Sequence, residues 1–127
     1  MKITFLSFEQ ILKIHKNQII NYGGILSIRD KNLLKSAIAQ PRITFKGKFL
    51  HENIFQMAAA YLFHIVNNHP FIDGNKRTGF VVAYIFLKIN KIEINISNES
   101  VEKMVLKIAQ GKVKKHEIAI WLNSKLK

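Results

Sequence analysis

The sequence predicts an all-α protein, and three observations support this prediction. Apolar residues recur at intervals of three and four along most of the chain, and Gly or Pro stands where these patterns stop. The segment 57–66 is apolar on nearly every side, which is typical of a central buried helix. The chain has 127 residues, of which 48% are hydrophobic, and it has no low-complexity linker. We therefore predict one domain over residues 1–127.

Two helices and a short hairpin are predicted in the first half of the chain. Ser7 and Gln10 form a capping box ahead of the first helix, and the Tyr-Gly-Gly sequence at 22–24 ends it. Asp30 is expected to cap a second helix, which a proline stops. Residues 42–50 alternate around a glycine and predict a short hairpin or flap.

Four helices are predicted in the second half. Two buried helices, over 52–68 and 75–90, flank a polar loop whose proline cannot continue an α-helix. Charged residues and Ile alternate over 91–96, which predicts a short extended segment. The apolar spacing then predicts a fifth helix through 101–108 and a sixth through 118–126.

The composition favours a cytoplasmic protein. The chain has no cysteine, which suits a reducing compartment. Glu9 interrupts the N-terminus too early for the apolar region of a signal peptide. The longest uninterrupted apolar run, 79–87, is far shorter than the ~20 residues of a membrane span. We expect neither secretion nor membrane insertion.

The chain is strongly basic, with a formal net charge of +12. A basic surface attracts acidic partners, whether nucleic acid or acidic protein, without choosing between them. The lysines are scattered over several segments, and the cluster of Lys112, Lys114 and Lys115 fits a solvated loop. We therefore do not expect direct binding of nucleic acid.

The loop between the two buried helices, residues 69–78 (His-Pro-Phe-Ile-Asp-Gly-Asn-Lys-Arg-Thr), is the most informative segment. A helix start is electropositive, so adjacent cations are unfavourable there unless an anion joins them. Lys76 and Arg77 nevertheless occupy the predicted helix start, beside exposed amides and the permissive Gly74. We interpret this loop as a phosphate-binding site.

The side chains of this loop suit phosphoryl transfer. His69 can remove a proton from an attacking hydroxyl near neutral pH. Asp73 can orient the nucleophile or hold Mg²⁺, which prefers one or two carboxylates together with phosphate oxygens and waters. Asn75 can donate its side-chain amide. Four residues are expected to bind the phosphate and stabilise its charge: Gly74, Asn75, Lys76 and Arg77.

Two other interpretations of the loop were weighed against this one. His69 could cap the first buried helix and Asp73 the second, with the two cations solvated, but so many phosphate-compatible groups in one turn argue against this. A metal hydrolase could use His64 with the same two residues. Pro70 breaks the helical spacing that this site would need, and no HExxH pair is present.

The run His69-Pro-Phe-Ile-Asp-Gly-Asn-Lys-Arg77 resembles the signature H-x-F-x-[D/N]-[A/G]-N-K-R of the death-on-curing (Doc) branch of the Fic/Doc family. The Tyr-Gly-Gly end of the first helix, the chain length and the tail over 111–121 are also similar to Doc toxins. The resemblance implies a six-helix bundle with a short flap. It also implies a toxin of a bacterial type II toxin–antitoxin pair.

Two positions separate the chain from Fic enzymes proper, which transfer AMP with a pattern such as H-P-F-x-[D/E]-G-N-G-R-x-x-R. Lys76 replaces the small glycine and fills space that those enzymes leave for nucleotide phosphates, and Phe80 replaces the second arginine. By its resemblance to Doc, the chain is expected to bind ATP reversed, with the γ-phosphate at the helix start, and to act as a kinase. The implied target is a threonine of elongation factor Tu, whose phosphorylation stops translation.

The resemblance also assigns roles by position. His69 would be the catalytic base, Asp73 would be the Mg²⁺-associated carboxylate, and 74–77 would bind nucleotide phosphate. A flap over 43–49 would align the target segment by strand addition. Its central residues are Thr44, Phe45, Lys46 and Gly47.

Inhibition is expected to come from another chain. Many Fic proteins carry an inhibitory pattern [S/T]-x-x-x-E-[G/N], but here Lys48 and Asn95 stand four residues before Glu52 and Glu99. We expect a separate antitoxin similar to Phd, whose acidic tail would be attracted to the basic surface. The alternatives are an adenylyl- or other nucleotidyltransferase on the same fold, and a catalytically inert basic binding module.

The other histidines are expected to be structural. His15 and His64 lie on apolar helical stripes and are predicted core residues. His51 and His116 open predicted helices and are expected to be caps or solvated side chains. Trp121, on the last predicted helix, is expected to pack in the interior of the protein.

Overall fold

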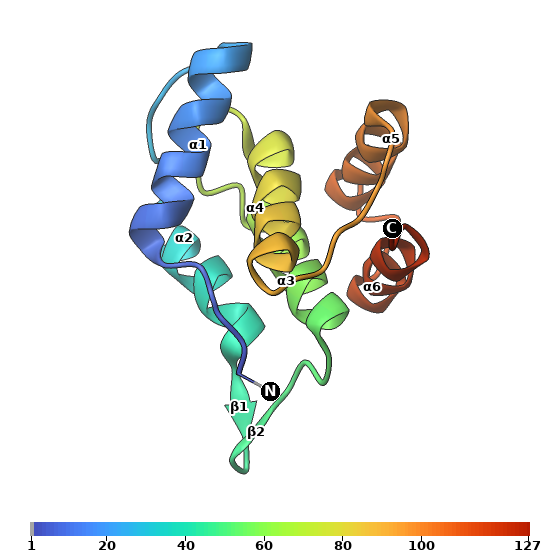
Figure 1. The fold of residues 1–127 in the computed structure, drawn as a ribbon. Helices are drawn as coiled ribbons and strands as arrows, with labels where there is room; N and C mark the ends of the chain where they lie inside the picture. The colour runs from blue at the N-terminus through green and yellow to red at the C-terminus, as the bar shows by residue number, and fades with distance from the viewer. Residues whose placement is uncertain (1) are drawn as a thin grey trace.

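The computed structural model describes residues 2–127 and confirms the all-α prediction (Figure 1). The predicted domain therefore includes one residue, Met1, that lies outside the described range. The helices of this range are α1 (Phe8–Tyr22), α2 (Lys31–Ala39), the 3₁₀-helix η1 (Gln40–Arg42), α3 (Ile54–Asn68), α4 (Asn75–Ile89), α5 (Asn98–Ala109) and α6 (Lys115–Ser124). A single hairpin is formed here by β1 (Thr44–Phe45) and β2 (Lys48–Phe49).

The helix ends follow the signals in the sequence. Ser7 and Gln10 form the predicted capping box, with side-chain to backbone distances of 2.8 and 3.2 Å. Gly23 ends α1 with a φ of 87°, a conformation that glycine adopts readily. The Asp30 carboxylate caps α2 by accepting the N–H of Leu33 at 3.0 Å.

Helix α3 lies at the centre of the molecule, packed against α2, η1, α4, α5 and α6 (Figure 1). Eight of its fifteen residues are buried, namely Met57, Ala58, Ala59, Ala60, Tyr61, Leu62, Ile65 and Val66. This confirms the prediction of a central helix that is apolar on nearly every side. Within residues 2–127, no helix combines the length and the hydrophobicity that a membrane span requires.

Gly79 permits a close approach of α4 to α3. A Cβ atom at this position would lie 3.1 Å from a methyl carbon of Val66 and 3.2 Å from one of Leu62. Because α3 ends and α4 begins at the polar loop, this tight packing fixes the two ends of the loop relative to each other.

The N-terminal segment is extended and is held on the helical core by two polar side chains. The Tyr61 hydroxyl accepts the N–H of Leu6 at 3.0 Å, and burial raises the pKa of Tyr61 to about 12. The Asn90 amide exchanges two 2.9 Å hydrogen bonds with the backbone of Thr4. The bond from Leu6 satisfies a buried backbone N–H that would otherwise lack a partner.

The predicted hairpin is confirmed. Thr44 pairs with Phe49 and Phe45 with Lys48 in an antiparallel register. Lys46 and Gly47 form the turn with φ angles of 52° and 78°, as a two-residue turn with two positive φ angles requires.

Two details of the C-terminal half differ from the predictions. The segment 91–96 forms only a single bridge, between Ile94 and Leu126. Leu126 therefore does not belong to α6, which ends at Ser124, and its side chain is half exposed. Trp121 is partly buried rather than enclosed, and its ring meets that of Phe80 edge-on at 6.4 Å.

The histidines confirm some predictions and correct others. His15 is buried and His116 is exposed, as expected. His51, expected to be a cap or a solvated residue, is instead buried and only 8% exposed. Lys115 is also not a solvated loop residue, because it is half-buried at the start of α6 and lies 2.9 Å from the partly buried His64.

Tyr61→Phe is expected to lower the free energy of unfolding by about 1–3 kcal/mol, because the buried N–H of Leu6 loses its acceptor. Urea denaturation at neutral pH measures this change. Tyr22→Phe, which removes a hydroxyl from a ring that is 66% exposed, is the matched control and should have no effect. Equal stability of the two variants would contradict the role given to the Tyr61 hydroxyl.

The stability of the fold is expected to fall in mild acid. Burial first, and then the charges of Lys115 and His51, lower the pKa of His64 from 6.5 to about 4. Between these two values the unfolded chain binds a proton that the folded chain does not, so the free energy of unfolding decreases as the pH falls from about 6.5 to about 4.

This pH dependence can be measured by denaturant unfolding across the same range. His64→Asn should reduce the slope, whereas His116→Asn, which changes an exposed side chain, should preserve it. An unchanged slope in His64→Asn would show that another group controls the acid response.

Candidate active site

The polar loop joins α3 to α4 through two residues in left-handed conformations. His69 ends α3 with a φ of 50°, and Gly74 precedes α4 with a φ of 82°. No side chain caps the start of α4. The first N–H groups of this helix therefore lack both an intrahelical partner and a side-chain partner. The alternative in which Asp73 caps α4 is wrong.

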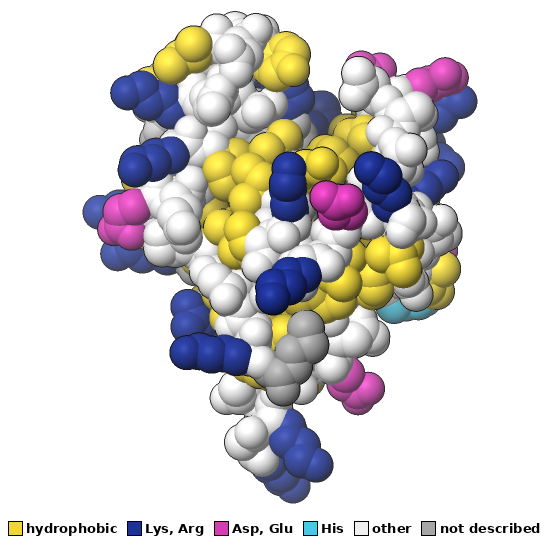
Figure 2. Space-filling model, viewed as in Figure 1, with side chains coloured by type: hydrophobic (Ala, Val, Ile, Leu, Met, Phe, Trp, Pro, Cys, Tyr) yellow, Lys and Arg dark blue, Asp and Glu magenta, His cyan; other side chains and the backbone are white. Residues whose placement is uncertain are grey.

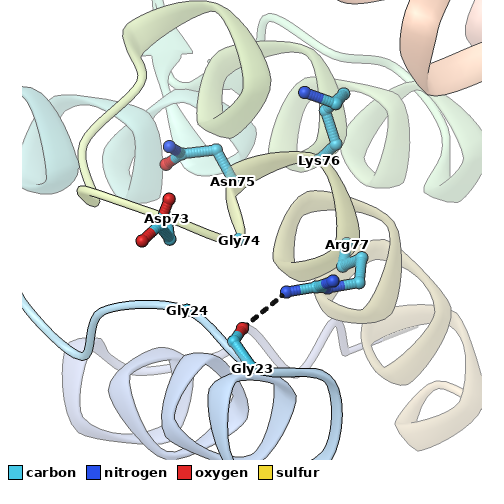
Figure 3. A pocket seen from close by; sticks show the side chains of 7 residues that line it. All are labelled: Gly23, Gly24, Asp73, Gly74, Asn75, Lys76 and Arg77. Atoms are coloured by element: carbon cyan, nitrogen blue, oxygen red, sulfur yellow. Dashed lines mark hydrogen bonds between the residues drawn. The ribbon is translucent and has the colours of Figure 1, made fainter.

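A cavity of about 250 Å³ lies at this helix start (Figure 3). It is lined by Gly23, Gly24, Asp73, Gly74, Asn75, Lys76 and Arg77. The structure thus brings the predicted residues 73–77 together and adds the end of α1, which was not predicted to contribute. An uncapped helix start with two adjacent cations is a favourable environment for phosphate oxygens.

Arg77 is held at the end of α1. Its Nη2 donates to the Gly23 carbonyl at 3.1 Å, and its guanidinium lies 5.3 Å from the Tyr22 ring centroid. Figure 3 shows the Arg77 side chain directed at Gly23, whereas the side chain of Lys76 extends in a different direction. Both cations are exposed to solvent.

Asp73 is positioned by the segment that follows α1. Its Oδ2 accepts the N–H of Ile25 at 2.7 Å. Gly24 permits this contact, because a Cβ atom there would lie 2.9 Å from the Cβ of Asp73 and the φ of Gly24 is 118°. In the sequence, the Gly-Gly pair indicated only a helix end.

His15, on α1, contacts two residues of the loop. Its Nε2 lies 2.8 Å from the carbonyl oxygen of Asp73, and its ring stacks on Phe71 with a centroid distance of 3.6 Å. Since a carbonyl can only accept, Nε2 carries the proton. Burial first, and then the charge of Arg77, lower the pKa of His15, although the backbone of Asp73 acts in the opposite direction. The predicted core histidine therefore also positions the site.

The Asn75 side chain is committed to the loop and is only 4% exposed. Its Oδ1 accepts the N–H of Phe71 at 3.0 Å, and its Nδ2 donates to the Phe71 carbonyl at 2.9 Å. Both N–H groups of this amide are used inside the protein, so donation to a ligand stays a prediction and would require one of these bonds to open. Asn75 contributes its position at the helix start.

This orientation of Asn75 also determines the tautomer of His69. The two bonds to Phe71 identify Nδ2 as the atom that lies 3.1 Å from the Nδ1 of His69. An amide nitrogen can only donate, so Nδ1 accepts and the neutral ring carries its proton on Nε2. The ring itself is exposed.

Arg29 and the segment around it were missed by the sequence analysis. The Arg29 guanidinium donates to the carbonyls of His69 and Asn68 at 2.6 and 2.9 Å and so satisfies the end of α3. The segment 25–29 runs beside the loop, with a bridge between Ile28 and Phe71. No pattern in the sequence links these residues, which are some 40 positions apart.

The hairpin does not lie beside the loop. Phe49 packs against Phe5, whose ring stacks on Phe86 near the end of α4, whereas the loop lies at the start of α4. A helix of this length spans about 22 Å. Figure 1 shows the hairpin and the end of α1 at opposite ends of the molecule. Thr44, Phe45, Lys46 and Gly47 are therefore poorly placed to align a target at His69.

The metal-hydrolase alternative finds no support in the geometry. Within residues 2–127, no group of three or more His, Asp or Glu side chains is arranged to hold a metal ion. His64 is instead engaged with Lys115. Phe80 also lies away from the cavity, because its ring faces Trp121 on α6.

Comparison with known proteins agrees with this geometry. The family model described as the Fic/DOC family matches residues 5–87, a range that includes the whole loop and most of α4. The chain belongs to the Fic/Doc family.

Two relatives place this Fic/Doc protein in the Doc branch. It is 40% identical over 75 residues to Toxin Doc of Mycolicibacterium smegmatis, an alignment that covers 59% of this chain and 58% of the relative. It is 27% identical over 116 residues to Protein kinase doc of Escherichia phage P1, which covers 90% of this chain and 89% of that protein. The chain thus aligns with little more than half of the mycobacterial relative.

Gly24→Ala is expected to disrupt the site of this Fic/Doc protein, because the added methyl group would displace Asp73. With Mg·ATP, the ligand expected from the resemblance to Doc, isothermal titration should show at least a tenfold loss of affinity, on the order of one lost hydrogen bond to a charged group. Gly111→Ala is the control for an alanine at positive φ (72°), since no atom lies within 4 Å of the added Cβ there. Equal affinities in the two variants would rule out the close contact as the cause.

Proposed function

We propose that this Fic/Doc protein is a Doc-like toxin that transfers the γ-phosphoryl group of ATP to a threonine hydroxyl of elongation factor Tu and thereby arrests translation. It would act in the cytoplasm and be inhibited by a separate, Phd-like antitoxin. The observation that carries the proposal is the uncapped start of α4, with Lys76 and Arg77 around it and with His69 outside the cavity lining but in contact with Asn75. The names of the two relatives, a toxin and a protein kinase, agree with it.

The proposed reaction is a single displacement. The target hydroxyl oxygen forms a bond to the γ-phosphorus, the bond from that phosphorus to the β–γ bridging oxygen breaks, and ADP leaves. The hydroxyl proton passes to Nε2 of His69. This step needs the tautomer that is protonated on Nδ1, so the contact between His69 and the Asn75 amide must open before or during transfer.

The cavity fits the phosphates better than the whole nucleotide. Its volume of about 250 Å³ is below the range of about 300–1,000 Å³ that is usual for sites enclosing a complete small ligand. We infer that the base and ribose lie on the surface outside it. Gly74 and the N–H groups of the first turn would face the phosphate oxygens, and Lys76 and Arg77 would balance their charge.

Asp73 can support a magnesium ion alongside these phosphates. Its Oδ2 is engaged by Ile25, so Oδ1 is the oxygen that remains for a cation. A single carboxylate suits Mg²⁺ when phosphate oxygens and waters complete the coordination. When bound, the ion would neutralise charge that develops on the phosphate oxygens.

The target segment would lie along 25–28 rather than along the hairpin. Ser27 accepts the N–H of Ile72, so one edge of this segment is paired with the loop. Leu26 and Ile28 alternate with Ser27, and their backbone groups face the opposite edge. An extended peptide on that edge would run past His69.

We also propose that residues 1–127 form one domain, because α5 and α6 pack on α3.

Labelled ATP tests the proposal. Purified elongation factor Tu is incubated with the protein and with ATP labelled on either the γ- or the α-phosphate. We expect transfer of the γ-label only, with the product on a threonine. Transfer of the α-label would establish nucleotidyl transfer instead, and transfer of neither label would favour an inert binding module.

Two variants locate the chemistry. His69→Ala should lower the rate of γ-label transfer by about 10²–10⁴-fold, the usual effect of removing a general base. His116→Ala, an exposed histidine on α6, is the control and should retain the full rate. An unchanged rate in His69→Ala would exclude His69 as the base.

A further inference from the structure

A groove lies between the start of α1 and the adjacent face of α2 and η1, which Figure 1 shows side by side. It has a volume of about 530 Å³. None of the residues that line it also lines the cavity at the start of α4, so a molecule in the groove would leave that cavity open. The lining includes Phe8, Glu9, Lys31, Lys35, Ile38 and Arg42.

Positive charge follows one face of α2 and η1 along this groove. Lys31 and Lys35 are about one helical turn apart, and Arg42 follows roughly two turns later. The buried Ile38 and the exposed Ala39 lie between Lys35 and Arg42. At a rise of about 1.5 Å per residue, the row from the first cation to the last is about 16 Å long. The groove is therefore a strip of cations with an apolar centre.

The three cations of the groove are available to a partner. Each of them is exposed, and none takes part in an ion pair within residues 2–127. The Lys31 ammonium lies 6.0 Å from the ring centroid of Phe8, and the Arg42 guanidinium lies 5.1 Å from that of Phe5. Glu9 is the one acid in the lining, so three positive charges and one negative charge leave a net charge of +2. Such a surface is complementary to an acidic partner.

The groove begins beside the segment that pairs with the polar loop. The N–H of Asp30 donates to the carbonyl of Pro70 at 3.0 Å, and Lys31 is the next residue along the chain. Pro70 directly follows His69. A polypeptide in the groove can therefore continue onto the free edge of 25–28, where the proposed function places the target segment.

We propose that this groove docks an acidic segment of the protein target, outside the residue that is phosphorylated. This inference rests on the proposed kinase function, which supplies the protein target. A segment that stays bound while the cavity at α4 is open suits a substrate better than an inhibitor of nucleotide binding.

The spacing of the groove indicates the chemistry of the docked segment. Side chains on one face of an extended chain are about 7 Å apart, close to the distance of about 5–6 Å between residues one helical turn apart. Acids at alternate positions of the target can therefore meet Lys31 and Lys35, and an apolar residue two positions later can reach Ile38. A nucleic acid backbone presents phosphates throughout and has no apolar side chain for this centre.

The kinetics of γ-label transfer test the proposal. The double variant Lys31→Glu/Lys35→Glu should raise the KM for elongation factor Tu about tenfold, because two exposed ion pairs are replaced by repulsion, and should change kcat less than about twofold. Lys107→Glu/Lys112→Glu makes the same change in net charge at exposed positions on and after α5, and it should retain the KM of the wild type.

Two kinetic outcomes would overturn the docking groove alone: label transfer with an unchanged KM in Lys31→Glu/Lys35→Glu, or an equal rise of KM in both double variants. The second outcome would show that the overall charge of the protein, and not this groove, attracts the target. Absence of label transfer by the wild type would instead overturn the proposed function and, with it, the protein target.

A peptide measures docking without phosphoryl transfer. The probe is acetyl-Glu-Ser-Glu-Ser-Leu-Ser-Glu-amide, titrated into uniformly ¹⁵N-labelled protein at constant ionic strength. We expect saturable shifts of the backbone amides of α2 in the wild type, and loss of these shifts in Lys31→Glu/Lys35→Glu. A peptide with serine in place of leucine should bind more weakly, and Mg·ATP should bind equally well with and without the probe.

The peptide titration can also contradict the groove in three ways. Absence of saturable shifts on α2 would exclude docking of such a segment. Equal affinity for the leucine and serine peptides would exclude the apolar contact. A loss of Mg·ATP affinity in the presence of the probe would identify the groove as an inhibitory site and not as a docking site for the target.

Discussion

The buried amide of Asn75 is the interaction on which the rest of the site depends. It joins the first residue of α4 to both backbone groups of Phe71 and also reaches His69. Three parts of the loop are therefore fixed by one side chain, and the helix start remains open for a ligand. An aspartate at this position could not donate, and an alanine would leave two buried backbone groups without partners.

A second set of contacts holds the loop from the side of α1. His15, Gly24 and Ile25 meet Asp73 through its carbonyl, its Cβ and its carboxylate, respectively. Arg77, in the first turn of α4, adds a further contact by donating to the carbonyl of Gly23 at the end of α1. The site therefore lies where the end of α1 meets the loop. The close packing of α3 on α4 at Gly79 fixes the two ends of the loop relative to each other.

Much of this structure could be predicted from the sequence because it is local. The helix caps, the hairpin turn and the membership of 73–77 in one cavity each depend on residues within a few positions of one another. The contacts of His15, Gly24 and Arg29 with the loop join residues 40 to 58 positions apart, and no spacing rule reports them. The hairpin was predicted correctly as a structure but assigned to the wrong end of the molecule, because a local turn signal contains no information about tertiary position. The burial of His51 was missed for the same reason.

The hydrogen bond between Arg77 and the Gly23 carbonyl has a consequence for anion binding. It uses an N–H group of Nη2 and, together with the Tyr22 ring, holds the exposed guanidinium at the end of α1. A guanidinium has five N–H groups, so others remain for an anion at the helix start. Because the side chain is already held in place, binding an anion removes less side-chain entropy than it would with a freely moving arginine.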